Sequence, residues 1–207
     1  MKAKKGKFIT IEGGEGTGKT TLIQNLKKII SAKNIKCCTT REPGGTKIAE
    51  TLRLALIDND FDLDQEIDII SFARSEHVTR LIKKELDNGS WVLSDRFFDS
   101  TLAYQALMEP ERFKEIEQYC LLAAGSCVPD LTIWLDINAE TGLKRAKDKN
   151  KFEKKGLNFH KKLRENFLKI SNIYPERIVK INTKGRNIDE VTNLAHSLIR
   201  GCFSEFK

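Results

Sequence analysis

The chain has 207 residues, of which 40% are hydrophobic and 31% are charged, and its length and hydrophobic share suit one α/β domain with its own core. No apolar stretch approaches the ~20 residues of a membrane span or forms a secretory signal, so we expect no membrane partner. The net charge of +7 fits polyanionic phosphate substrates as well as nucleic acid and does not choose between them.

Strand-like apolar runs occur at residues 8–11, 36–40, 91–94, 131–136 and 177–181. Helical spacing predicts helices at about 19–32, 46–57, 64–88, 110–124, 139–148, 157–171 and 188–199. Asn187 is the predicted N-cap of the last of them. This alternation predicts a three-layer α/β fold, a doubly wound parallel five-stranded sheet with helices on both faces. Ligands of such folds bind beyond the carboxyl ends of the strands.

A phosphate-binding motif, G-x-x-x-x-G-K-[ST], follows the first predicted strand and opens the first helix. Its residues are Gly13, Gly14, Glu15, Gly16, Thr17, Gly18, Lys19 and Thr20. The glycines let backbone N–H groups point at phosphate oxygens, and the helix adds the positive end of its dipole. Lys19 is expected to reach the β- and γ-phosphates, and Thr20 to bind Mg²⁺. An ordinary glycine-rich turn is the alternative, which the strand-to-helix context disfavours.

Charged residues follow the next two predicted strands. The second strand runs into the segment R-E-P-G-G-T at 41–46, whose proline and glycines favour equally a shaped pocket or a plain turn followed by an N-cap at Thr46. The third strand ends in Asp95 and Arg96. Phosphoryl transfer needs this combination, because a carboxylate can hold Mg²⁺ and a guanidinium can stabilise charge on the transferred phosphoryl group. A surface ion pair is the alternative for these two residues.

With these motifs the chain resembles the bacterial thymidylate kinases, which phosphorylate dTMP to dTDP. The similarity runs nearly end to end and includes residues 8–21, 40–46, 95–105, 129–132, 136 and 140–146. The block D-R-F-F-D-S-T-L-A-Y-Q at 95–105 is the most specific part, because other phosphate-loop kinases lack it. The resemblance implies a P-loop nucleoside-monophosphate kinase fold, ATP as the phosphoryl donor, Mg²⁺ as cofactor and a homodimer.

The resemblance also implies roles for individual residues. ATP would bind the phosphate loop, residues 13–20, together with Thr21, and Mg²⁺ would bind Thr20, Asp95 and Glu42. The implied catalytic residues are Lys19, Arg96, Glu15 and Arg145. Arg96 would bridge the acceptor phosphate and the γ-phosphate, and Glu15 would face the 3′-hydroxyl of the dTMP sugar.

A second set of residues is implied for the acceptor, dTMP. These residues are Glu15, Glu42, Pro43, Arg53, Arg74, Arg96, Ser100, Thr101, Tyr104 and Gln105. Arg53 matches an arginine that binds the acceptor phosphate, and Glu42-Pro43 matches a pair often joined by a cis peptide. Tyr104 would crowd the ribose 2′ position and so favour deoxyribose.

The predicted helix at 64–88 carries one departure from the family pattern. Arg74 matches the arginine that binds a thymine carbonyl, but Ile70 stands where a phenylalanine usually stacks on the base. Phe72 lies about 200° around the helix from Arg74, so in a regular helix it cannot take the place of the stacking phenylalanine that position 70 lacks. Base stacking, worth ~1–3 kcal/mol, is therefore in question. We expect His77 to be a surface or rim residue.

The basic segment at about 144–156 corresponds to a lid. Relatives whose phosphate loop lacks an arginine take the charge that stabilises the transition state from this lid, and here Arg145 is the arginine in the segment. Lys149 and Lys151 stand where arginines are commoner, and lysine lacks the bidentate fork. A solvated helix face is the alternative for several of these lysines, and Arg164, farther along, could equally pair with an acid.

We therefore expect an enzyme that moves the γ-phosphoryl of ATP to dTMP, with another pyrimidine deoxynucleotide as the alternative acceptor. A GTPase-like switch is a hypothesis from another class, suggested by residues 150–153, which superficially match a guanine-binding motif. This hypothesis is disfavoured because the segment lacks the final Asp of that motif. Nucleic-acid binding is disfavoured because few aromatic residues interleave the basic ones. The five cysteines have no metal-ligand spacing, so we expect reduced thiols and a cytoplasmic protein.

Overall fold

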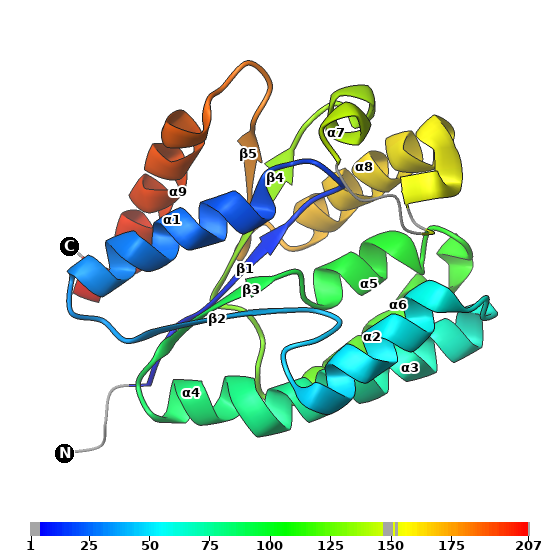
Figure 1. Ribbon diagram of the computed structural model, residues 1–207, viewed down its shortest axis with the longest axis horizontal. Helices are drawn as coiled ribbons and strands as arrows, with labels where there is room; N and C mark the ends of the chain where they lie inside the picture. The colour runs from blue at the N-terminus through cyan, green and yellow to red at the C-terminus, as the bar shows by residue number, and fades with distance from the viewer. Residues whose placement is uncertain (1–4, 147–150, 152, 207) are drawn as a thin grey trace.

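The computed structural model describes residues 5–146, 151 and 153–206 (Figure 1). Five parallel strands form one sheet in the order β2-β3-β1-β4-β5. The strands are β1 (Phe8–Glu12), β2 (Cys37–Arg41), β3 (Trp91–Asp95), β4 (Leu131–Asp136) and β5 (Ile178–Asn182). The predicted α/β fold class is confirmed, and each strand lies within one residue of its predicted bounds.

The helices of the described chain alternate with the strands. They are α1 (Lys19–Ala32), α2 (Lys47–Asp58), α3 (Leu63–His77), α4 (Lys83–Asp87), α5 (Phe98–Tyr104), α6 (Phe113–Ala124), α7 (Ala139–Arg145), α8 (Gly156–Ile173) and α9 (Ile188–Cys202). Short turns of 3-10 helix lie at η2 (Pro110–Arg112), η3 (Glu153–Lys155) and η4 (Ser204–Phe206). The predicted N-cap Asn187 is confirmed, since its side chain accepts a hydrogen bond from the backbone of its helix. Thr46, the N-cap of the plain-turn alternative, caps α2 in the same way.

Two of these helices differ from the prediction. The single helix expected at 64–88 consists of α3, a π-helical turn η1 (Val78–Ile82) and α4. Helix α5 was not predicted, because its seven residues are too few to show a clear helical period. The predicted end of the helix at 139–148 falls beyond α7, partly outside the described residues.

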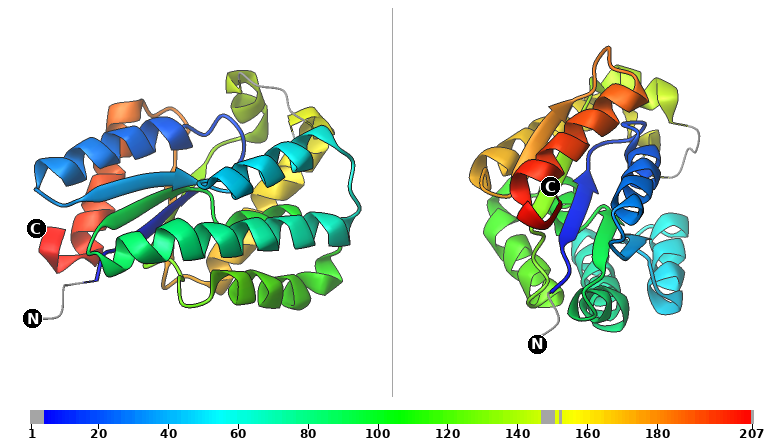
Figure 2. Two further views of the ribbon diagram at one scale, coloured as in Figure 1. Left: turned by 60° about the horizontal axis from the view of Figure 1, so that its bottom comes forward. Right: turned by 90° about the vertical axis from the view of Figure 1, so that its left-hand side faces the viewer.

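The sheet separates two hydrophobic clusters because neighbouring residues of a strand face opposite sides. Phe8 packs with residues of α3 to α6 and α8, whereas Ile9 packs with residues of α1 and α9. Figures 1 and 2 show α1 and α9 together on one side of the sheet and α4, α5 and α6 on the other. Helix α2 packs on α3. Within the described chain, no helix is long and apolar enough to cross a bilayer.

The strand register brings the chemically important residues to one edge. Asp95 is the register partner of Ile11 in β1 and of Arg41 in β2. The phosphate loop that follows β1 therefore begins beside the residues that follow β2 and β3. The predicted convergence of these segments at the carboxyl ends of the strands is a consequence of this register.

Candidate active site

The phosphate loop at 13–20 is shaped by close backbone approaches. Gly16 has φ +65°, and a Cβ there would lie 2.0 Å from the carbonyl oxygen of Gly142 in α7. Any side chain would force the loop away from that helix. Lys19 is buried, and its Nζ donates to the carbonyl oxygens of Gly13 at 3.2 Å and Gly14 at 2.9 Å. Burial, with the positive charge of Arg96 nearby, lowers the pKa of Lys19.

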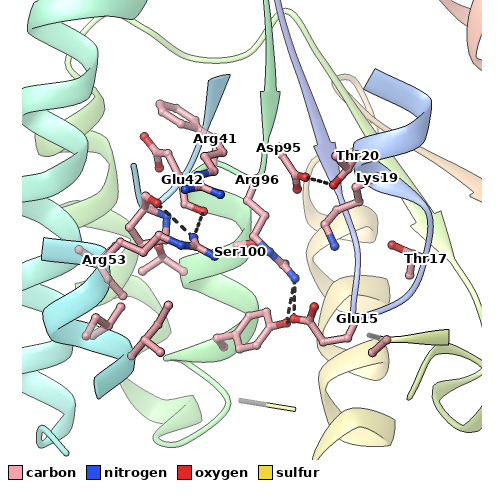
Figure 3. A pocket seen from close by; sticks show the side chains of 18 of the residues that line it. Glu15, Thr17, Lys19, Thr20, Arg41, Glu42, Arg53, Asp95, Arg96 and Ser100 are labelled. Carbon is pink, nitrogen blue, oxygen red and sulfur yellow. Dashed lines mark hydrogen bonds and ion pairs between the residues drawn. The ribbon is translucent and has the colours of Figure 1, made fainter. Parts of the chain in front are cut away.

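Thr20 and Asp95 meet at the end of β3. The hydroxyl of Thr20 donates to Oδ2 of Asp95 at 2.9 Å, as the dashed line in Figure 3 shows. A hydroxyl and a carboxylate are hard oxygen ligands of the kind Mg²⁺ takes, with waters and substrate phosphates completing its shell. The two residues fit the predicted magnesium site. No cluster of three His, Cys, Asp or Glu side chains that could hold a metal by itself occurs in the described part of the chain.

The backbone of Arg96 is held in an uncommon conformation. Its φ is +70°, a region that non-glycine residues seldom adopt. Its N–H donates to Ile11 at 3.0 Å, and its carbonyl oxygen accepts from the Ser94 hydroxyl at 2.6 Å. These bonds fix the turn between β3 and α5 and turn the guanidinium toward the phosphate loop. Backbone strain of this kind is common at functional sites.

The guanidinium of Arg96 contacts both the phosphate loop and α5. One nitrogen, Nη1, donates to the carbonyl oxygen of Gly13 at 2.9 Å and to Ser100 at 3.0 Å. The other, Nη2, donates to Oε1 of Glu15 at 2.8 Å and to the hydroxyl of Tyr104 at 3.2 Å. Figure 3 shows this side chain pointing at Glu15. One arginine thus connects the phosphate loop with α5.

Glu15 is ionised at neutral pH in this arrangement. Burial raises the pKa of its carboxyl, but the charges of Arg96 and Lys19 and a 2.9 Å hydrogen bond from Tyr104 outweigh that effect and lower it to about 2. Burial raises the pKa of Tyr104, so its hydroxyl stays protonated and can donate. Glu15 therefore presents an acceptor-only carboxylate to the cavity.

Glu12, the last residue of β1, is a buried acid for which the sequence predicted no role. It is fully buried, and its carboxylate accepts from the Phe97 N–H at 2.7 Å and from the Ser100 hydroxyl at 2.6 Å. Burial and the negative charge of Asp99 raise its pKa to about 7. An acid on a strand whose other residues are all apolar or threonine was the available signal.

A buried cluster surrounds Glu42, which follows β2 and is joined to Pro43 by a cis peptide. Its Oε2 accepts from Nε of Arg74 at 2.9 Å, and its Oε1 lies 3.0 Å from Nδ1 of His77. The other ring nitrogen of His77 lies 2.6 Å from the Thr40 hydroxyl. The expectation of a surface or rim His77 is wrong: the residue is fully buried, because its place three residues after Arg74 puts both on the face of α3 that meets Glu42.

The region expected to hold the base lies between α3 and α5. Nη2 of Arg74 donates to the Thr101 hydroxyl at 2.8 Å. Ile70 is buried at the wall of the cavity, whereas Phe72 is 60% exposed. Phe72 therefore does not take the stacking position, as the helical geometry predicted.

One cavity of about 640 Å³ collects these groups. The predicted site residues that line it are Glu15, Gly16, Thr17, Gly18, Lys19, Thr20, Thr21, Glu42, Pro43, Arg53, Arg74, Asp95, Arg96, Ser100, Thr101, Tyr104, Gln105 and Arg145. Gly13 and Gly14 belong to the loop but do not line it. In Figure 3, Arg53 lies across the cavity from Lys19 and Thr20. Its Nη1 donates to the carbonyl oxygen of Pro43 at 3.1 Å.

The predicted lid is described only in part. Arg145 lines the cavity next to the phosphate loop, while residues 147–150 and 152 lie outside the described residues, and with them Lys149 and two of the four residues of the guanine-like motif. Lys151 donates to Glu66 of α3 at 3.1 Å. Arg164 pairs with Asp136 at the end of β4, the pairing with an acid that the sequence left open.

Comparisons with known proteins agree with this geometry. The family model described as "Thymidylate kinase" matches residues 11–195. A thymidylate kinase of Carboxydothermus hydrogenoformans is 39% identical over 89% of this chain and 93% of its own length. One of Clostridium novyi is 38% identical over 90% of this chain and 95% of its own length. The crystal structure of thymidylate kinase from Ehrlichia chaffeensis has a TM-score of 0.78 and 29% identity, over 95% of this chain and 99% of that one.

Proposed function

Because this chain belongs to the thymidylate kinase family, we propose that it transfers the γ-phosphoryl group of ATP to dTMP and releases dTDP and ADP. The observation that carries the proposal is the position of Arg96. Its guanidinium contacts the phosphate loop through Gly13 and Glu15, and α5 through Ser100 and Tyr104, within one cavity. A group in that position can neutralise charge on a phosphoryl group passing between two nucleotides.

The donor side would use the phosphate loop. Backbone N–H groups of the loop and Lys19 would hold the ATP phosphates, and Thr20 and Asp95 would hold Mg²⁺. Mg²⁺ supplies charge neutralisation between the phosphates. We retain Glu42 as a third candidate ligand, although both of its oxygens contact other side chains. Arg145 stands beside the loop as the candidate lid arginine.

The acceptor side would use Arg53 and Arg96 for the phosphate of dTMP. A phosphate monoester is already a nucleophile at neutral pH, so these residues need only position it and lower repulsion between two anions. The ionised Glu15 would accept a hydrogen bond from the 3′-hydroxyl of the sugar. Tyr104, held by Glu15 and Arg96, would fill the space next to the 2′ carbon.

The base would lie against Arg74 and Thr101. Arg74 offers only donors, which suits a carbonyl of the base. Ile70 in the cavity wall supports a second candidate acceptor, another pyrimidine deoxynucleoside monophosphate, because an aliphatic side chain gives up the selectivity of an aromatic stack.

We also infer a homodimer. Helices α2, α3 and α6 pack side by side (Figures 1 and 2) and expose large apolar side chains: Leu54 is 59% exposed, Phe72 60% and Leu122 79%. Apolar groups clustered on adjacent helices are typical of protein interfaces. A single kinase domain with a lid at about 144–156, in the cytoplasm, completes the proposal, and the free thiols of all five cysteines support that location.

The test compares acceptors. Purified protein with ATP and Mg²⁺ is assayed with dTMP, dUMP and dCMP, and kcat/KM is measured for each. We expect the highest kcat/KM for dTMP. A higher kcat/KM for dCMP or dUMP would replace dTMP by the second candidate, and turnover of none of the three by folded protein would reject the kinase proposal.

A further inference from the structure

A buried carboxylate outside the proposed catalytic set contacts the wall of the base region. Glu66 of α3 is 8% exposed. Its Oε2 accepts from the side-chain amide nitrogen of Gln105 at 3.0 Å, and its Oε1 accepts from Nζ of Lys151 at 3.1 Å. Lys151 also donates to the carbonyl oxygen of Asn59 at 3.0 Å. Glu66 therefore joins the end of α5 to the lid segment, and Lys151 extends the connection to the segment after α2.

The chemistry of this contact fixes the orientation of Gln105. An amide side chain can turn either its oxygen or its nitrogen toward a neighbour, but an ionised carboxylate only accepts hydrogen bonds. The nitrogen of Gln105 must therefore face Glu66, and the oxygen Oε1 is the remaining polar atom. Gln105 lines the cavity, and among the described residues no group donates to its Oε1.

The place of Gln105 along α5 connects it with Arg74. Thr101 accepts from Arg74, and Gln105 lies four residues later, where its N–H donates to the carbonyl of Thr101. Residues four apart share a helix face. The cavity wall thus presents the donors of Arg74 and the acceptor of Gln105 as neighbours.

We propose that Glu66 is a positioning residue for base selection, which holds Gln105 so that its Oε1 accepts a hydrogen bond from a ring N–H of the acceptor base. The inference rests on the proposed function. Thymine presents a carbonyl next to a ring N–H, which matches a donor next to an acceptor. Cytosine presents an amino group next to a bare ring nitrogen, so the same pair of side chains would meet it donor to donor and acceptor to acceptor. Mismatched buried polar groups are strongly disfavoured.

The experiment measures KM for dTMP and the inhibition constant of dCMP against dTMP in the full-length protein. Glu66→Gln keeps the size of the side chain but can offer either an oxygen or an N–H to Gln105, so the amide is no longer fixed. We expect the preference for dTMP over dCMP to fall by about 10-fold, mainly through KM for dTMP rather than kcat. Asp68→Asn, an exposed site on the same helix, removes the same charge and should leave the preference unchanged.

A double variant separates positioning from a purely structural bond. In Glu66→Gln combined with Gln105→Ala, the preference should equal that of Gln105→Ala alone. Both substrates are measured on one protein sample, so partial unfolding cancels from the ratio. An unchanged preference for dTMP in Glu66→Gln overturns the inference. So does an equal loss of that preference whether Gln105 is present or replaced by alanine. In either case, dTMP turnover by the wild type leaves the proposed function standing. If the wild type does not phosphorylate dTMP, both fail.

Discussion

The guanidinium of Arg96 donates to the Glu15 carboxylate at 2.8 Å, although the two residues lie 81 positions apart in the chain. Their contact joins the end of β3 to the phosphate loop and lies within the cavity that both line. It places a fixed positive charge in the cavity beside the phosphate loop, and it keeps an ionised carboxylate facing the same cavity.

The first prediction concerns Arg96. Arg96→Lys keeps a positive charge but loses the planar fork that reaches Gly13 and Glu15 together. We expect kcat to fall by about 10²–10³-fold, the usual loss for a group that stabilises developing charge. Steady-state kinetics with saturating ATP measures it. Arg80→Lys, at an exposed position, is the matched control, and wild-type kcat in Arg96→Lys would contradict the role.

The lowered pKa of Glu15 predicts that the free energy of unfolding depends on pH. Its folded-state pKa of about 2 lies below the ordinary value of 4.5, so its contribution is present above pH 4.5 and is lost as pH falls toward 2. The full contribution is on the order of 3 kcal/mol. Urea unfolding of the wild type and Glu15→Gln at pH 7, 5 and 3.5 should give a difference in unfolding free energy that shrinks with falling pH. A difference independent of pH would exclude this account.

The raised pKa of Glu12 predicts that its contribution to the free energy of unfolding changes with pH in the opposite direction. Its folded-state pKa of about 7 lies above 4.5, so the stability it contributes is fully present below pH 4.5 and is lost as pH rises through 7. Carboxyl ¹³C NMR should show a glutamate titrating near pH 7 that disappears in Glu12→Gln. Ser100→Ala removes a hydrogen bond that lowers this pKa and should move the midpoint higher. A Glu12 midpoint below pH 5 would be inconsistent with the buried site.

Replacing Ile70 by an aromatic residue is expected to strengthen the binding of dTMP. Ile70→Phe places a ring in the wall of the cavity where it can stack on the base. An aromatic contact worth ~0.5–1.5 kcal/mol should lower KM for dTMP roughly 2- to 10-fold. The control is Ile173→Phe, at an exposed position of α8. An unchanged or higher KM in folded Ile70→Phe would show that the base does not lie against this side chain.

The exposed apolar side chains predict the oligomeric state. Light scattering after gel filtration should give twice the mass of the 207-residue chain for the wild type. Phe72→Asp and Leu122→Asp bury a charge in the proposed interface and should each give a monomer. Leu168→Asp, on α8, should stay dimeric. Monomeric wild type at micromolar concentration would rule out the proposed dimer.

Local signals in the sequence predicted the fold and the phosphate loop, and the resemblance to the thymidylate kinases named most of the other residues that line the cavity. Asp95 and Arg96 follow a predicted strand, and parallel strands bring their carboxyl ends to one edge. Relations that depend on packing could not be predicted. His77 is buried because α3 turns that face toward Glu42, and Glu66 meets Lys151 across 85 residues of chain. Such contacts carry no spacing signal in the sequence.

The most direct test of the central claim is the stoichiometry of product formation. Purified protein is incubated with ATP, Mg²⁺ and dTMP, and ³¹P NMR follows dTDP and ADP. We predict that the two products appear in equal amounts and that neither accumulates when dTMP is omitted. Formation of ADP without dTDP, or of neither product by folded protein, would contradict phosphoryl transfer to dTMP.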